Sequence, residues 1–369
     1  MMALLAPLAT ALLITTVLML ALRRVAPFLG LVDVPGGRKT HHGEVPVIGG
    51  IAMYLGALVA VVLAGDGVVS QFGVLLACGM MVAVGALDDR FDLRPRYRVA
   101  VHLAAAVTLI MATGFRVDSL GDLFGLGEVR LGPFDFLFTV LATVALINAF
   151  NMLDGVDGIA GGVALVALAG LSFHLVPAGN LAAAATLALA GSVAGFLVFN
   201  LPARFNRKRL AFMGDAGSTL LGFALAGLAL VAVQPRVDGG MPPALVLWML
   251  PVPIVELFTS TIRRLVSGTS PMQADRGHFH HRLLDAGFSV RAVFLLYMVA
   301  SSIAVVIGLW LWHKGVSEAV LFGVFLTVSA LWWVATHNAR RLLALVPRSL
   351  RRRTWPSASM TRRTRLRRD

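Results

Sequence analysis

Long apolar segments run through most of this chain of 369 residues and limit the folds that are open to it. Hydrophobic residues make up 58% of the sequence and charged residues only 14%, whereas soluble domains hold about a quarter charged residues. Stretches of about 20 apolar residues are long enough to cross a bilayer as helices. The sequence therefore predicts an all-α, polytopic integral membrane protein.

The apolar segments predict about eleven transmembrane helices. These lie near residues 3–22, 47–64, 68–87, 98–113, 133–150, 159–177, 181–200, 215–234, 243–262, 292–312 and 318–336. If the amino terminus is outside, the only Lys and Arg residues left on the outer side are Arg116, Arg130, Arg236 and Lys314. Because inner loops carry the excess of Lys and Arg, we expect the amino terminus outside and the carboxyl terminus in the cytoplasm.

The sequence predicts one membrane-embedded domain, residues 1–336, followed by a basic cytoplasmic tail, residues 337–369. We expect such an arginine-rich tail beside the inner leaflet to meet anionic lipid heads and not nucleic acid. The single cysteine, Cys78, lies inside an apolar run, which excludes an internal disulfide and a cysteine-rich metal site.

The stretch from Asn148 to Gly162 places Asp154 and Asp157 at the seam between two apolar runs, together with the carboxamide of Asn151. A charged side chain deep in a bilayer costs about 2.5–3.5 kcal/mol on insertion scales, so these acids need a reason to be there. Glycines indicate that the helix breaks here and that the backbone approaches another group; they are Gly155, Gly158, Gly161 and Gly162. An acid-lined binding site is favoured over a polar loop that caps the next helix.

A second acidic cluster, Asp88 and Asp89, ends the predicted span 68–87. Adjacent carboxylates at the carboxyl end of a helix oppose its dipole, so a cation must offset them. Mg²⁺ suits hard oxygen ligands, and the pair would let one carboxylate bind metal while the other stays basic. The alternative is a surface cluster that is neutralised by the arginines at positions 90, 94, 96 and 98.

Asp215 opens the predicted span 215–234, with small residues around it and Ser218 three positions later. A lone Asp in this place is most often an N-cap, yet a glycine-flanked helix amino terminus also suits a metal–phosphate ligand. The other inner acid clusters favour the second interpretation. In the first inner loop Arg38, Lys39 and His41 fit a membrane anchor and a phosphate contact equally well.

Three histidines, His278, His280 and His281, follow Asp275 and Arg276 in the last inner loop. Such a cluster can ligate zinc. The neighbouring arginines and the absence of cysteine favour contact with a phosphate-rich ligand.

All these polar groups leave the predicted spans on the inner side. Acids with a divalent metal, ringed by basic loops, suit a phosphorylated substrate, because phosphoryl transfer needs positioning and charge neutralisation. The place at the membrane boundary indicates one lipid phosphate and one cytosolic nucleotide. A transporter would carry its acids mid-span with repeat symmetry, which is not evident. A noncatalytic scaffold would not need the histidines or the aspartates.

Five motifs in order resemble those of the polyprenyl-phosphate N-acetylhexosamine-1-phosphate transferases. They are Asp33-x-Pro35 with Arg38-Lys39-x-His41 and Gly49-Gly50; Asp88-Asp89; Asn148-x-x-Asn151-x-x-Asp154-Gly-x-Asp157-Gly; Phe212-Met-Gly-Asp215-x-Gly-Ser218; and His278-x-His280-His281. The resemblance runs from Asp33 to about Gly287 and is greatest to the WecA-type branch, because of the runs that begin at Ala86 and Asn148.

The resemblance implies transfer of GlcNAc-1-phosphate from UDP-GlcNAc to undecaprenyl phosphate at the cytoplasmic face of a bacterial inner membrane, with release of UMP. It implies Mg²⁺ as cofactor, with Mn²⁺ as an alternative. Asp88 would be the base, Asp215 a metal ligand, and Asp89 a support of both. Residues that would hold the nucleotide sugar are Asn151, Asp154, Asp157, Asn200, Phe212, Arg264, His278, His280 and His281, and those that would hold the lipid phosphate are Arg38, Lys39 and His41.

One position departs from the resemblance: the family usually has Asp near the end of the span 243–262, where this chain has Glu256. The role of this acid and the sugar preference therefore stay open, and another UDP-N-acetylhexosamine is the alternative donor. A homodimer is a further open alternative.

Overall fold

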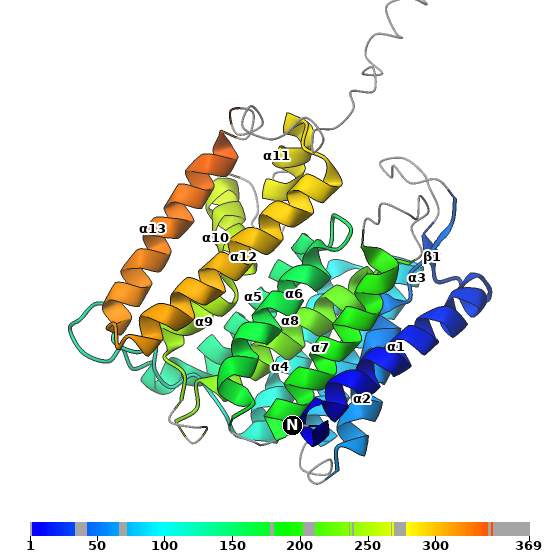
Figure 1. The fold of residues 1–369 in the computed structure, drawn as a ribbon, viewed down its shortest axis with the longest axis horizontal. Helices are drawn as coiled ribbons and strands as arrows, with labels where there is room; N and C mark the ends of the chain where they lie inside the picture. Colours follow the sequence, from blue (N-terminus) through cyan, green and yellow to red (C-terminus); the bar gives the residue numbers. More distant parts are fainter. Residues whose placement is uncertain are drawn as a thin grey trace, which may run out of the picture.

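The computed structural model of the chain describes residues 2–33, 43–65, 72–177, 181–201, 211–235, 237, 240–266, 268, 278–338 and 341. Within these ranges the protein is a bundle of long, mutually inclined helices (Figure 1). The helices are α1 (Met2–Leu29), α2 (Gly49–Leu63), α3 (Phe72–Phe91), α4 (Pro95–Thr113), α5 (Asp135–Leu153), α6 (Ile159–Leu175), α7 (Leu181–Asn200), α8 (Gly214–Ala232), α9 (Pro243–Met249), α10 (Pro251–Val266), α11 (Phe279–Ala286), α12 (Val290–His313) and α13 (Glu318–His337).

Strand structure is confined, in the described part of the chain, to one short hairpin and two isolated bridges. In the hairpin β1 (Val32–Asp33) pairs antiparallel with β2 (Val45–Pro46). A 3₁₀ turn, η1 (Gly132–Phe134), leads into α5. These observations confirm the predicted helical class.

Seven of the described helices are long and apolar enough to cross a membrane, or eight if the bent pair α9–α10 forms one span. The prediction of eleven spans is therefore not confirmed. The apolar helices α2 and α6 hold only 15 and 17 residues, against the roughly 20 that a perpendicular crossing needs. The helix α4, which carries Arg96 and Arg98, is not among the seven.

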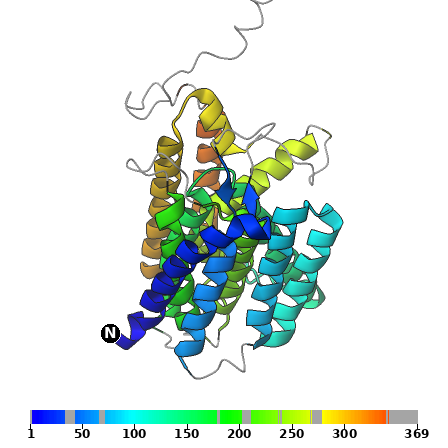
Figure 2. The same cartoon turned by 90° about the vertical axis from the view of Figure 1, so that its right-hand side faces the viewer.

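The predicted span 243–262 is not one straight helix. The axes of α9 and α10 meet at 93°, with Leu250 between them. Pro251 and Pro253 open α10, and because proline has no N–H, neither can continue the hydrogen-bond ladder of α9. As a result α10 leans away from the bundle, as its yellow-green ribbon shows in Figure 2.

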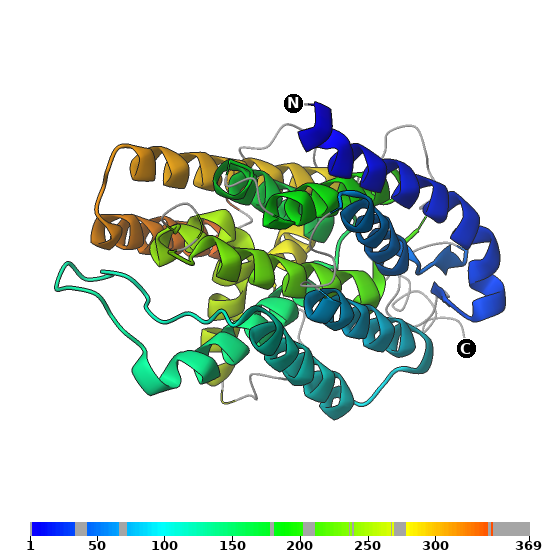
Figure 3. The same cartoon turned by 90° about the horizontal axis from the view of Figure 1, so that it is seen from below.

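The best-buried of the seven candidate spans is α8, which packs against α2, α3, α5 and α6. In the view from below in Figure 3 it runs through the middle of the bundle. Its amino-terminal turn lies so close to α2 and α3 that a Cβ at Gly50 would stand 2.2 Å from the Gly217 nitrogen. A Cβ at Gly85 would stand 2.3 Å from the Ala216 nitrogen. The two glycines thus set how closely three helices meet around the start of α8.

We expect Gly85→Ala to lower the free energy of unfolding by about 1–3 kcal/mol, because the added methyl overlaps backbone that cannot move away. Gly323→Ala on α13 is the matched control, since nothing lies within 4 Å of a Cβ there. Thermal unfolding of both variants in detergent measures the difference. Equal midpoints for the two would contradict the close packing of α3 on α8.

Candidate active site

The segment that precedes α8 is tied to the segment that precedes α2. Val47 and Phe212 form a parallel bridge, and the Phe212 N–H donates to the Pro46 carbonyl over 2.8 Å. The Gly49 and Gly50 N–H groups donate to the carbonyls of Phe212 and Met213, over 3.0 and 3.1 Å. The glycine pair that the sequence singled out therefore anchors the backbone that carries Asp215.

The carboxylate of Asp89, at the end of α3, caps the amino terminus of α8 from a different helix. Its two oxygens accept the N–H groups of Asp215 and Ala216 at 2.9 and 3.2 Å. A negative charge at a helix amino terminus is favourable because free N–H groups and the helix dipole both point toward it. Gly214 has a φ of +72°, and a Cβ there would overlap the Asp89 carboxylate.

Asp215 is not itself the cap that the sequence left open. The N-cap residue of α8 is Met213, and Asp215 lies inside the first turn. Its carboxylate faces away from the helix amides and toward two other elements. Asn151, near the end of α5, donates to Asp215 Oδ1 over 2.7 Å and also contacts Ser218 Oγ at 3.1 Å.

Arg98 joins two of the predicted site acids. One guanidinium nitrogen forms an ion pair with Asp88 Oδ2 and also lies 3.1 Å from Asp215 Oδ2. The other oxygen of Asp88 accepts the Leu93 N–H at 2.7 Å. Asp88 is buried, whereas Arg98 and Asp215 keep part of their side-chain surface exposed. The ends of α3 and α8 and the first turns of α4 thus share one ionic site.

Arg98 is one of the four arginines that the sequence offered as neutralising the acid pair, and it is the one that forms an ion pair with Asp88. The sequence analysis gave it no individual role in the site. α3 ends at Phe91, Asp92 takes a left-handed φ of +50°, and Pro95 starts α4 only four residues after α3 ends. This tight connection returns the chain beside α3, so that the first turn of α4 faces the acid pair. The short break before Pro95 was the signal for this placement, although it does not say which arginine turns inward.

The helix α5 continues through Leu153 and ends at Asp154, so the break falls within the stretch that the glycines marked. Asn148 is exposed and lies outside the acid cluster, with its amide 3.4 Å from Met152 Sδ. Burial raises the pKa of the Asp154 carboxyl well above its ordinary value. Nearby carboxylates add to this rise, namely those of Asp215, Asp89 and Asp157. A cation brought by a ligand would relieve this concentration of acids.

The turn after Asp154 is held from the next inner segment. Gly158, with a φ of +80°, donates its N–H to Asn200 Oδ1 over 2.7 Å. The amide of Asn200 in turn donates to the Ala211 carbonyl over 3.0 Å. Asn200 is buried, so it fixes two backbone segments beside the acids.

The histidine motif lies against the same turn. A Cβ at Gly155 would stand 2.9 Å from His280 Nε2 and 3.4 Å from His281 Nε2. The close backbone approach that the glycines predicted is thus confirmed at Gly155. His278 is the N-cap residue of α11, and Arg264 is buried in the last turn of α10.

The remaining predicted site residues are Phe212 and three residues of the first inner loop. Phe212 is partly buried and joins the network through its backbone. The predicted lipid-phosphate contacts, Arg38, Lys39 and His41, lie outside the described residues, as do most of the loop 201–211 and the tail beyond residue 341.

The oxygen atoms gathered here fit a divalent cation of the Mg²⁺ type. Asp88 and Asp215 already converge on one positive charge, that of Arg98. Among the described residues no three His, Cys, Asp or Glu side chains lie together as a metal cage. Mg²⁺ is usually held by one or two carboxylates plus substrate phosphates and waters, and so does not require such a cage. The described histidines form no cage for zinc either.

Comparison with known proteins adds independent findings. The model of glycosyl transferase family 4 matches residues 71–233. A protein of Yersinia pestis named undecaprenyl-phosphate alpha-N-acetylglucosaminyl 1-phosphate transferase is 34% identical over 333 residues, 89% of this chain and 90% of that protein. This chain belongs to glycosyl transferase family 4.

Proteins of the same name from Escherichia coli O157:H7 and Haemophilus influenzae are each also 34% identical. The alignments cover 95% and 90% of this chain, and 96% and 94% of those proteins. The family 4 match contains the ionic site of Asp88, Arg98 and Asp215 together with the turn after Asp154. The relatives extend the likeness to nearly the whole chain, which confirms the family resemblance inferred from the five motifs.

We expect Asn200→Ala to lower the free energy of unfolding by about 1–3 kcal/mol, because the Gly158 N–H and the Ala211 carbonyl lose their buried partner. Asn148→Ala is the matched control, since that amide is exposed. Thermal unfolding in detergent distinguishes the two variants. A midpoint for Asn200→Ala as high as that of the control would show that the amide does not hold these segments.

Proposed function

We propose that this chain transfers GlcNAc-1-phosphate from UDP-GlcNAc to undecaprenyl phosphate and yields undecaprenyl-diphospho-GlcNAc and UMP. The relatives that match nearly the full chain carry the name of this activity. The observation that carries the proposal is the meeting of Asp88, Asp215 and Arg98 at one ionic site, where charge on a phosphate can be bound and offset. The product is a first membrane-bound intermediate for a cell-surface polysaccharide.

The reaction is an exchange of phosphate partners. An oxygen of the lipid phosphate attacks the β-phosphorus of UDP-GlcNAc, which is the phosphorus attached to the sugar. The bond between this phosphorus and the oxygen that bridges it to the uridine phosphate breaks. UMP leaves with that oxygen. Asp88 takes the proton of the lipid phosphate, which makes the attacking oxygen a better nucleophile.

Arg98 has to change partners before Asp88 can act as this base. In the structure both oxygens of Asp88 are engaged, one by Arg98 and one by the Leu93 N–H. A phosphate that draws the guanidinium toward itself frees one oxygen of Asp88. Arg98 then offsets charge on the phosphate in place of charge on the carboxylates, as bidentate guanidinium groups do well.

Asp215 would hold Mg²⁺ or Mn²⁺, and Asp89 would support this metal site through its cap on α8. When bound, the metal would neutralise charge on the donor diphosphate. Asn151 orients the Asp215 carboxylate for this task through its hydrogen bond. The turn with Asp154 and Asp157, together with Phe212, Arg264 and the histidine motif, would bind the nucleotide sugar. Arg38, Lys39 and His41 would bind the lipid phosphate.

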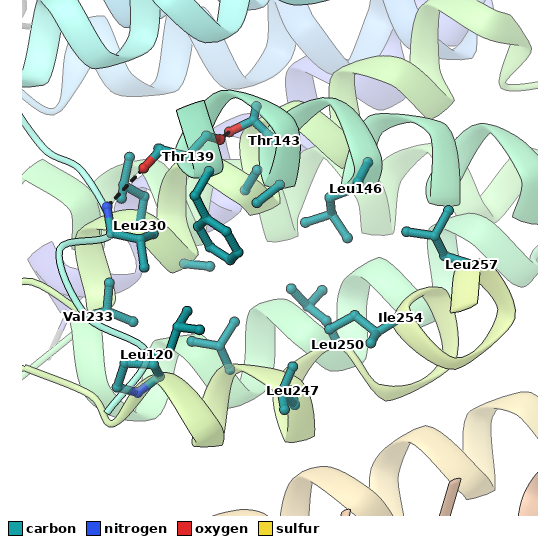
Figure 4. Close-up of a pocket in the computed structure, with 18 of the residues that line it drawn as sticks. Leu120, Thr139, Thr143, Leu146, Leu230, Val233, Leu247, Leu250, Ile254 and Leu257 are labelled. Atoms are coloured by element: carbon teal, nitrogen blue, oxygen red, sulfur yellow. Dashed lines mark hydrogen bonds between the residues drawn. The ribbon is translucent and has the colours of Figure 1, made fainter. Parts of the chain in front are cut away.

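Apolar cavities flank the bent pair α9–α10 and suit the polyprenyl chain. One, of about 260 Å³, lies between α5, α8, α9 and α10, and its lining is almost entirely apolar (Figure 4). The other, of about 920 Å³, lies between α10 and α13 and includes Arg263 and Arg282 in its lining. Both cavities share Leu247 and Ile254, so the broken helix separates them. The isoprenoid tail of the lipid would bury its apolar surface in these cavities, and the phosphate of the lipid would lie toward the polar side chains of the active site.

We further propose that the chain crosses a bacterial inner membrane eleven times, with the amino terminus outside and the active site and carboxyl terminus on the cytoplasmic side. The basic loops favour this orientation. The loop with Arg116 and Arg130 and the turn with Lys314 lie at the end of the bundle away from β1 and α11 (Figure 1). The basic tail would meet anionic lipid heads on the inner face.

Reporter fusions test this orientation. Green fluorescent protein joined after Asp369 should fluoresce, whereas alkaline phosphatase inserted at Gly315 should be active, because only the outer side allows its disulfides to form. The reverse pattern at both positions would exclude the proposed orientation.

The activity itself is tested with labelled UDP-GlcNAc, undecaprenyl phosphate and Mg²⁺ on the purified chain. We expect a labelled lipid diphosphate-sugar and UMP in equal amounts. A panel of UDP-N-acetylhexosamines then identifies the donor, and faster turnover of another sugar would select the alternative donor. No product with any of them would exclude the proposed enzyme.

Asp88→Asn and Asp215→Asn should each lower the turnover rate by at least about a thousandfold, since each removes a charge that acts directly at the reacting phosphates. Asp118→Asn, an exposed acid in the loop 114–131, is the control and should keep wild-type turnover. Rates are measured after equal membrane insertion has been verified. Wild-type turnover in either site variant would remove that residue from the mechanism.

A further inference from the structure

We propose that Glu256 is a positioning residue: with Tyr297 it fixes the buried ring of His280, and this ring holds His281 at the turn that binds the donor. The proposal rests on the proposed function and assigns different tasks within the histidine motif. It gives Glu256 a role that the sequence left open.

Glu256 is a buried carboxylate in the middle of α10, with only 2% of its surface exposed. A carboxylate in such a place is strongly unfavourable unless hydrogen-bond donors or cations surround it. The hydroxyl of Tyr297, on α12, donates to Glu256 Oε1 in a very short hydrogen bond. Tyr297 is fully buried too, so this pair ties α10 to α12 inside the protein.

Two histidine rings face the same carboxylate. His280 Nδ1 lies 3.7 Å from Glu256 Oε1, and His278 Nδ1 lies 3.8 Å from Oε2. The two rings are stacked, with centroids 5.6 Å apart and planes within 13° of parallel. Each carboxylate oxygen thus has one ring nitrogen facing it, at a distance longer than that of a hydrogen bond.

The opposite edge of the His280 ring faces the donor turn. Its Nε2 is the nearest atom to the position that a Cβ of Gly155 would take, at 2.9 Å. His280 has no exposed surface, and its ring lies between Glu256 and Gly155. The proposal therefore gives His280 a different task from the direct contact with the nucleotide sugar that the resemblance implies.

His281 is the neighbouring ring that keeps part of its surface exposed at this boundary. Its centroid lies 4.4 Å from that of His280, with the planes tilted by 53°. Its Nε2 lies 3.4 Å from the same position at Gly155. The chain of contacts from Tyr297 through Glu256 and His280 therefore ends at a ring beside the turn of Asp154 and Asp157.

The length of the Glu256 side chain suits this arrangement. An aspartate would withdraw the carboxylate by one methylene, and α10 would have to move before Tyr297 and both rings could meet it again. The amide of Glu256→Gln keeps the length and can still accept from Tyr297. It lacks the negative charge that both ring Nδ1 atoms face.

The test is the initial rate against UDP-GlcNAc concentration, at saturating undecaprenyl phosphate, for Glu256→Gln, Tyr297→Phe and His281→Ala. We expect Glu256→Gln and His281→Ala to raise KM for the donor by about tenfold, the size of effect that removal of an outer-shell partner commonly has. We expect kcat to stay within about threefold, because the reacting carboxylates are untouched. Tyr297→Phe should raise KM by a smaller factor. Ser301→Ala is the control for a lost buried hydroxyl on α12 and should keep the wild-type KM.

Two further measurements distinguish a loss of ring positioning from a general loss of fold stability. The double variant Glu256→Gln/His281→Ala should be no worse than the poorer single variant, since both changes act through one ring. The thermal midpoint of Glu256→Gln should stay within about 2 °C of wild type, below the shift that 1 kcal/mol produces. Additive losses in the double variant, or a wild-type KM in Glu256→Gln, would overturn the proposal.

If Glu256→Gln does not fold, Tyr297→Phe and the double variant Tyr297→Phe/His281→Ala are measured in its place. The same criteria for KM and additivity then apply. Turnover by the wild-type chain distinguishes failure of the proposed activity from failure of the positioning role. Turnover of UDP-GlcNAc by wild type with unaltered donor KM in the variants refutes the positioning role alone. No turnover by wild type refutes both.

Discussion

The ion pair of Asp88 and Arg98, shared with Asp215, is the interaction around which the acid site is arranged. Carboxylates at the ends of apolar helices are unfavourable unless a cation or a set of donors meets them. Here α3 and α8 each supply an acid, and α4 returns beside α3 to supply the arginine. The arrangement requires the three helix ends to lie within one side-chain length of one another. Gly85 and Gly214 have no side chain where the helix ends come closest.

The division of work between the two neighbouring aspartates follows from helix geometry. Successive residues on a helix point about 100° apart, so the carboxylates of Asp88 and Asp89 point in different directions. Asp89 faces the amides of α8 and fixes the position of Asp215, whereas Asp88 faces Arg98. One carboxylate therefore caps α8, and the other holds the arginine of α4. The Asp-Asp pair is visible in the sequence, but the direction in which each carboxylate points is set by α8, which lies more than a hundred residues away.

The sequence was sufficient for the helical class, the membrane character, the family and the gathering of the acid motifs, because hydropathy and the spacing of polar residues are local properties. It was not sufficient for features that depend on contacts between distant segments. Arg98 looks like its neighbours Arg94 and Arg96 in the sequence, and only the return of α4 beside α3 distinguishes it. The break of α9 from α10 likewise lies inside an apolar run that hydropathy reads as one span. Pro251 and Pro253 mark the place of this break, but its angle depends on the helices that pack around it.

The histidine motif illustrates the same limit at a finer scale. Three imidazoles in four residues look equivalent in sequence, and any of them suits a phosphate or a metal. Folding places His280 in full burial between Glu256 and Gly155, while the neighbouring ring of His281 stays partly exposed. Burial therefore separates one imidazole of the motif from solvent. The carboxylate beside this ring comes from α10, and the hydroxyl that donates to it comes from α12, so the break between α9 and α10 helps to place this contact. A straight helix through Leu250 would carry Glu256 along the axis of α9, away from the rings that it now faces.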